Sequence, residues 1–137
     1  NQEFRNALRG FLEARGCTAE WRIGGADDPI PLLLRVELPG RARGLKADIL
    51  WAHKRWQREA LARTVTIKVA RLKVVVLHPE DLILMKLEAG GPQDLLDVER
   101  LLSNPPAELN LKRLETKASQ LQLSAELGKC LRRVRGK

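Results

Sequence analysis

The hydrophobic positions in the first part of the chain follow two different periods. Apolar residues recur every three or four positions over residues 4–12, which predicts a helix that ends near Gly16. Apolar and charged residues then alternate over 34–38 and again over 45–49, which is typical of half-buried strands. We expect these two strands to form an antiparallel hairpin, and a shorter strand precedes them at 19–23.

Farther along the chain the pattern changes from strands to helices. Residues 65–69 and 72–77 favour two strands, and the three valines at 74–76 predict burial on both faces of the second one. A helix follows, with Pro79 in its first turn, and its residues 82–87 are apolar on nearly all sides, which predicts a central position. The other expected elements are a short helix or loop at 53–63 and helices at 94–102, 111–121 and 127–134.

This order of elements predicts the fold class. A helix, a group of strands and then a group of helices indicate an α+β protein rather than a βαβ repeat. With 137 residues the chain has the length of a single domain, in which residues 1–77 form a helix and sheet and residues 78–137 form a helical half. No window approaches the roughly 20 apolar residues of a membrane span, so we expect no membrane partner.

The cysteine content and the absence of a secretory leader favour the cytoplasm. Cys17 and Cys130 are too few for a disulfide scaffold and have no metal-ligand spacing, so packing is their simplest role. We expect His53 to be exposed and His78 to have a structural role. Motifs for phosphate loops, zinc proteases and serine hydrolases are all missing.

Charge is distributed unevenly along the chain, whose net charge is +8. Residues 35–73 are net +8 and residues 110–137 are net +6, whereas residues 74–109 between them are net −5. Such basic segments fit either a solvated surface or a partner rich in phosphates. For the second case the candidate contacts are Lys46, Arg132 and Arg133.

Four charged residues stand in apolar or helical surroundings. Asp48 lies in the middle of a strand, where a carboxylate is costly unless it is paired or binds a metal, and Lys86 lies in the most apolar helix. Asp94 and Asp97 share a helix face. A purely structural interpretation stays open: Asp48 pairs with Lys46 or Lys86, Asp94 caps its helix and Asp97 pairs with Arg100.

Three segments together resemble the nucleotidyltransferase-like superfamily, and most closely the small bacterial proteins related to the nucleotidyltransferase toxins of abortive-infection systems. They are a strand that contains an aspartate, a Pro-Glu-Asp-Leu helix start followed by a lysine, and a Gln-Asp-x-x-Asp helix start, at residues 45–50, 74–89 and 92–99. The resemblance covers roughly residues 2–102. It implies a mixed sheet flanked by helices and the transfer of a nucleoside monophosphate from a nucleoside triphosphate.

The resemblance also implies roles for single residues. Asp48 would be the third metal-binding carboxylate for Mg²⁺, Lys86 would face the nucleotide phosphates, and Asp94 and Asp97 would be the late acidic pair, either catalytic or structural. The Gly-Ser turn and Asp-x-Asp strand that supply two of the three metal carboxylates in active members are missing. Asp27-Asp28 lies in a Gly/Pro turn and does not replace them, and the sequence begins downstream of their expected place.

We therefore expect a degenerate or truncated nucleotidyltransferase-like protein that binds nucleotide or nucleic-acid phosphates and is not active alone. This hypothesis requires Asp48 and Lys86 to converge on one cleft. A second hypothesis is a non-catalytic basic module for nucleic acid or protein binding. A third is a homo-oligomer or a partnered subunit that completes an open sheet edge.

Overall fold

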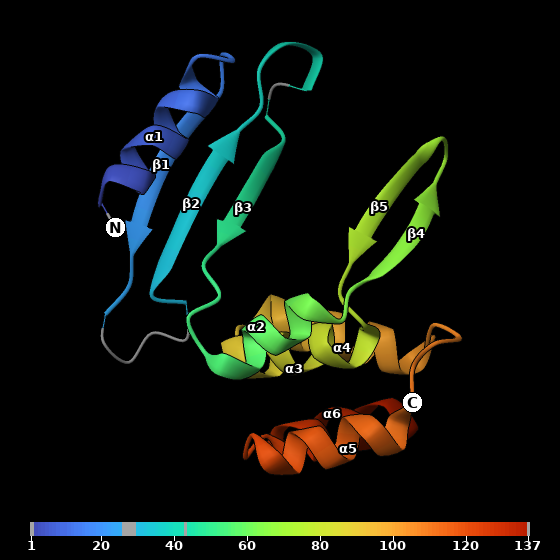
Figure 1. Cartoon of the computed structure of the whole chain (residues 1–137). Coiled ribbons are helices and arrows are strands. Elements are labelled where there is room, and N and C mark those ends of the chain that lie inside the picture. The colour runs from blue at the N-terminus through green and yellow to red at the C-terminus, as the bar shows by residue number, and fades with distance from the viewer. Residues whose placement is uncertain (1, 26–29, 43, 137) are drawn as a thin grey trace. The chain divides into compact units, whose positions relative to one another are not determined.

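The computed structural model describes residues 2–25, 30–42 and 44–136 and confirms the α+β class. The chain divides into two compact units, Asn1–Trp51 and Ala52–Lys137 (Figure 1). Both sheets in the described residues are antiparallel, whereas the resemblance implies a single mixed sheet. The hairpin of residues 65–76 belongs to the second unit, and the single-domain organisation stays a prediction. The turn predicted at Asp27-Asp28 lies outside the described residues.

The first unit is a helix on a three-stranded sheet. Helix α1 (Gln2–Glu13) precedes strands β1 (Thr18–Ile23), β2 (Leu32–Glu37) and β3 (Lys46–Leu50). The strands follow one another in the order β1-β2-β3, with antiparallel pairing throughout. This confirms the predicted helix and the predicted hairpin of the second and third strands. A short 3-10 turn at Gly40–Ala42 lies in the connection between them.

Alternation along β2 determines the two faces of this sheet. Leu34 and Val36 are buried and, together with Ala19, form a small core against which Leu8 and Leu12 of α1 pack. Successive strand residues point to opposite faces, so Arg35 and Glu37, which alternate with Leu34 and Val36, lie on the other face. α1 lies alongside β1 in Figure 1.

The second unit begins with α2 (Arg55–Ala62) and a two-stranded hairpin, β4 (Val65–Val69) and β5 (Leu72–Val76). The register places Ile67 opposite Val74 on an apolar face and Lys68 opposite Lys73 on the other face. Val75 is 65% exposed and Val74 is 37% exposed, so the predicted burial of these valines on both faces is wrong. A run of β-branched residues favours a strand, but burial requires packed layers on both sides.

The turn of this hairpin contains a strained residue that offers a test. Ala70 has φ 53°, a left-handed conformation that costs a residue with a Cβ about 1 kcal/mol. We expect Ala70→Gly to raise the free energy of unfolding by about 0.5 kcal/mol, because the relief of strain exceeds the added entropy of the unfolded chain. Urea unfolding measures this change. Ala62→Gly, at an exposed helix position, should act in the opposite direction, and a destabilised Ala70→Gly would contradict the argument.

Four helices complete the second unit: α3 (Pro79–Ala89), α4 (Pro92–Ser103), α5 (Leu111–Gln120) and α6 (Ser124–Arg135). The predicted central helix is confirmed, since α3 contributes three residues to the core and contacts both α4 and α5. Cys130 is 1% exposed in this core, as the packing interpretation predicts. The core residues are Ile83, Leu84, Leu87, Val98, Leu114, Ala118, Leu127 and Cys130.

The first turn of α3 buries two acids. Asp81 has no exposed surface, and its Oδ1 accepts hydrogen bonds from Arg63 Nη2 at 2.8 Å and Lys117 Nζ at 2.7 Å. Burial alone would raise the pKa of Asp81, but the hydrogen bonds from Lys117 and Arg63 outweigh it and hold this pKa below its ordinary value. The neighbouring Glu80 accepts from the Asn110 N–H at 3.1 Å. These bonds fasten α5 to α3.

Candidate functional site

Lys86 is the centre of a charged cluster at the junction of α3 and α4. Its Nζ lies 2.8 Å from Asp97 Oδ2 and 3.3 Å from Asp94 Oδ1. Asp97 also accepts from Gln93 Nε2 at 3.0 Å and from Arg100 Nη1 at 3.3 Å. The structure thus brings together the three residues that were predicted as catalytic. We call Lys86, Asp94 and Asp97 the α3–α4 cluster.

The sequence between the two helices explains why these side chains meet. α3 ends at Gly90, whose φ of 65° is the left-handed conformation that favours glycine at a helix end. α4 begins after Gly91, where an added Cβ would lie 2.9 Å from Asp94 Oδ2. The two glycines therefore permit a short connection that sets the start of α4 against Lys86. The cap proposed for Asp94 is absent, because the carboxylate bonds to Lys86 and no side chain caps this helix.

The mutual pairing shifts the acidities in the cluster. Burial would lower the pKa of Lys86, but the hydrogen bonds that Lys86 donates to Asp97 and Asp94 raise it above its ordinary value. The hydrogen bond from Lys86 is the main cause of the lowered pKa of Asp97. Lys86 is therefore a charged ammonium at neutral pH and Asp97 a carboxylate, so neither group is poised to exchange a proton near pH 7.

A hollow opens beside this cluster. Its volume is about 410 Å³, and Lys86 and Arg100 bring two cations to its wall. Asp97 lies between them and bonds to both. The side chains that line it are those of Lys86, Asp97, Arg100, Leu101 and Asn104. Two ammonium or guanidinium groups at one opening can hydrogen bond to the oxygens of an anion that enters it.

Asp48 has a different partner from those that were predicted. The register of the sheet places it directly opposite Arg35, whose Nε and Nη2 donate to the two carboxylate oxygens at 2.8 and 2.7 Å. This bidentate bond lowers the pKa of Asp48 and occupies both oxygens. Lys46 lies two residues away on the same face of the strand but does not form an ion pair with Asp48. Asp48 belongs to the first unit and Lys86 to the second, so their convergence stays a prediction.

The predicted phosphate contacts differ in how available they are. Arg133 Nη1 donates to Glu99 Oε1 at 3.0 Å, and this ion pair links α6 to α4. Arg132 is exposed and has no side-chain partner within the described part of the chain. Lys46 is exposed and faces Glu37 across the sheet. Of the two arginines, only Arg132 thus has a guanidinium free for a ligand.

The described residues bring no group of three metal-binding side chains together. No three His, Cys, Asp or Glu side chains within residues 2–25, 30–42 and 44–136 are grouped so that they could hold a metal ion. Lys86 lies where an ion shared by Asp94 and Asp97 would be needed, and Arg35 occupies Asp48. The requirement for Mg²⁺ therefore stays a prediction from the resemblance alone.

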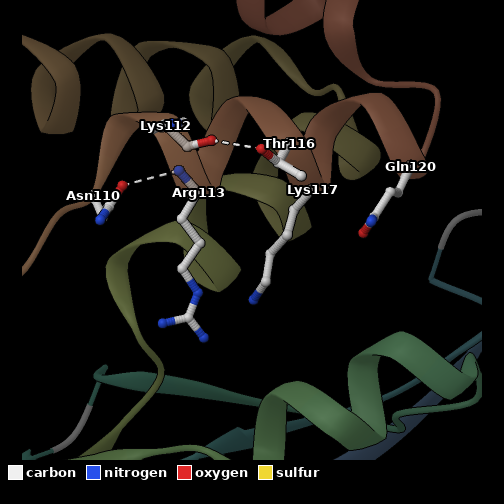
Figure 2. A pocket seen from close by; sticks show the side chains of 6 residues that line it. All are labelled: Asn110, Lys112, Arg113, Thr116, Lys117 and Gln120. Carbon is white, nitrogen blue, oxygen red and sulfur yellow. Dashed lines mark hydrogen bonds between the residues drawn. The ribbon is translucent and has the colours of Figure 1, made fainter.

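Sequence analysis missed a second group of polar residues, on α5. Asn110, Arg113, Lys117 and Gln120 are spaced three or four positions apart, which places them on one face of the helix. That spacing was readable in the sequence, but the buried Asp81 that holds Lys117 became visible only in the folded chain. Figure 2 shows Arg113 and Lys117 extending side by side from this face.

Comparison with known proteins adds no relative. Protein-family models, curated proteins and solved structures were each compared with this chain, and none of them matches. Among the described helices, none combines the length and the apolar character needed to cross a membrane. The functional argument therefore depends on the geometry of the sites.

Proposed function

We propose that this protein is nucleotidyltransferase-like and binds the phosphates of a nucleotide at the α3–α4 cluster. The observation that carries the proposal is the position of Lys86 Nζ between Asp97 and Asp94 beside a hollow that Arg100 also lines. The three residues come from two helices. Apolar contacts alone would suffice to pack those helices, so packing does not require this charged cluster. Transfer of a nucleotide by this chain alone is not part of the proposal.

The charges in the cluster are compatible with an anionic ligand that competes with the two carboxylates for Lys86 and Arg100. Asp94, Asp97, Lys86 and Arg100 together carry two negative and two positive charges. A triphosphate can replace the carboxylates as the partner of Lys86 and Arg100, because charge-assisted hydrogen bonds to phosphate and to carboxylate have similar geometry. Lys86 is 23% exposed along its side chain, so its ammonium can reach a ligand in the hollow.

Replacement of Lys86 tests this proposal. We expect Lys86→Gln to weaken ATP binding, measured by calorimetry with and without Mg²⁺, by about tenfold, because a hydrogen bond from a charged group is lost. The matched control is Lys54→Gln, which removes another lysine that pairs with a carboxylate, Glu88 at 2.8 Å. It should leave binding unchanged. ATP binding that is undetectable in the unaltered protein, or equal in Lys86→Gln, would refute the proposal.

A second candidate is the non-catalytic module that binds nucleic acid through its basic surface. The observation in its favour is the exposed Arg132, which lacks a side-chain partner among the described residues. The two candidates differ in their dependence on salt and on Lys86. Binding through the surface would weaken steeply with salt and ignore Lys86→Gln, whereas binding in the hollow would respond to that substitution.

A further inference from the structure

One face of α5 forms a groove lined only by cations and neutral polar side chains. The groove has a volume of about 430 Å³, and its lining includes three cationic residues and no carboxylate (Figure 2). The other side of the helix is apolar, with Leu114 and Ala118 fully buried in the core. The lining residues are Asn110, Lys112, Arg113, Thr116, Lys117 and Gln120.

Two of the cations are free to bind a ligand. Lys112 and Arg113 are exposed, and their side chains have no partner within the described ranges of the chain. Arg113 can donate up to five hydrogen bonds in a planar fork, which suits the oxygens of a phosphate group. A free arginine beside a free lysine in an acid-free groove is an arrangement that attracts anions.

The third cation, Lys117, is held in place. Its Nζ bonds to the buried Asp81 at 2.7 Å, and Arg63 bonds to the same oxygen. Asp81 is therefore compensated by two cations, and Glu80, the other acid beneath α5, already accepts from Asn110. The Asn110 side chain caps the helix by accepting from the Arg113 N–H at 2.9 Å. The N–H groups of Asn110 and Arg113 at the start of α5 thus have partners within the chain, and the cations available to a ligand in the groove are side chains.

The length of the groove bears on the size of its ligand. From residue 110 to residue 120 the helix extends about 15 Å at 1.5 Å per residue. Along the axis of a double helix, each strand carries one phosphate about every 3.4 Å. Several consecutive phosphates therefore fit along the groove, whereas a single phosphate would contact only one part of it.

We propose that the α5 groove binds the phosphate backbone of a nucleic-acid strand. Lys112 and Arg113 make the charged contacts, and Gln120 offers a neutral donor at the far end. The contacts go to phosphates only, so the groove distinguishes strands by charge and shape and not by base sequence. This proposal does not rest on the α3–α4 cluster, whose residues are not part of the groove.

The test compares two double variants that lose the same charge. Binding of a fluorescein-labelled oligouridylate of about twelve nucleotides is measured by anisotropy between about 50 and 200 mM salt. Lys112→Gln with Arg113→Gln should weaken binding about tenfold and reduce the salt slope by about 1.4, the value for two lost phosphate contacts on a single strand. The control pair is Lys129→Gln with Arg135→Gln on α6, two exposed residues without an ion pair in the described part of the chain. It should change binding less than about threefold.

Three results would overturn the proposal. The first is no binding of the oligonucleotide by the unaltered protein. The second is equal weakening in both double variants, which would indicate diffuse attraction to the whole basic surface. The third concerns inorganic tripolyphosphate as a competitor: if it displaces the oligonucleotide at a matched phosphate concentration, the groove takes free phosphates and not a strand. Circular dichroism of each variant verifies that α5 stays folded.

Discussion

Asp81→Asn is expected to lower the free energy of unfolding by about 3 kcal/mol. The carboxylate is completely buried and its Oδ1 accepts from both Arg63 and Lys117, which come from different parts of the second unit. An amide there cannot balance two cations, so both would lose their partner on folding. Urea unfolding followed by circular dichroism measures the loss. The matched control, Asp94→Asn, should cost less than about 1 kcal/mol, because Asp94 is partly exposed and Lys86 keeps Asp97.

The stability lost in Asp81→Asn depends on pH with a definite sign. The pKa of Asp81 is lower in the folded protein than its unfolded value of about 3.9. The ionised Asp81 therefore stabilises the fold in full when the pH is above its unfolded pKa. This stabilisation is lost as the pH falls toward the lower pKa of Asp81 in the folded protein. The difference in stability between the unaltered protein and Asp81→Asn should therefore be constant near neutral pH and narrow below about pH 4. A difference that widens in acid would contradict the assignment of Asp81 as a carboxylate.

Leu114→Ala should also destabilise the protein strongly, by about 3 kcal/mol. Leu114 has no exposed surface and joins α5 to the core that α3, α4 and α6 share. Its removal takes apolar area out of the core and leaves a cavity that these helices cannot fill without moving.

Leu111 on the same helix supplies the comparison. It is 37% exposed, so Leu111→Ala should cost about 1 kcal/mol in the same unfolding experiment. Equal losses at the two positions would mean that α5 does not pack on the core as described. Because α5 also carries the groove, Leu114→Ala should weaken oligonucleotide binding as well, whereas Lys112→Gln with Arg113→Gln should leave the unfolding free energy almost unchanged.

Local patterns predicted the secondary structure because each pattern has one dominant physical cause. The three-and-four spacing over residues 4–12 became α1, since apolar residues at that spacing fall on one face of a helix. The alternation over 34–38 and 45–49 became β2 and β3. The exception is the valine run at 74–76, where strand formation was predicted correctly and burial was not. A β-branched residue favours a strand by itself, but only a neighbouring layer can bury it.

The partners of the charged residues could not be predicted from local sequence patterns. Asp48 was assigned to Lys46, to Lys86 or to a metal, and its partner is Arg35, which the register of two strands places opposite it. Asp97 was assigned to Arg100, and the structure confirms that pair while adding Lys86. A pair within one helix follows from the helical repeat, whereas a pair between elements depends on how those elements pack.

The sequence by itself determined the α+β class, the places of the helices and strands, the central position of α3 and the two glycines that join it to α4. Those features depend on interactions within a few residues along the chain. Tertiary structure alone decided that Asp81 lies buried between Arg63 and Lys117, which are 18 and 36 positions away. It also decided that Lys112 and Arg113 have no acidic partner among the residues that the structure describes. Charges act through space, so their availability for a ligand is known only after the chain has folded.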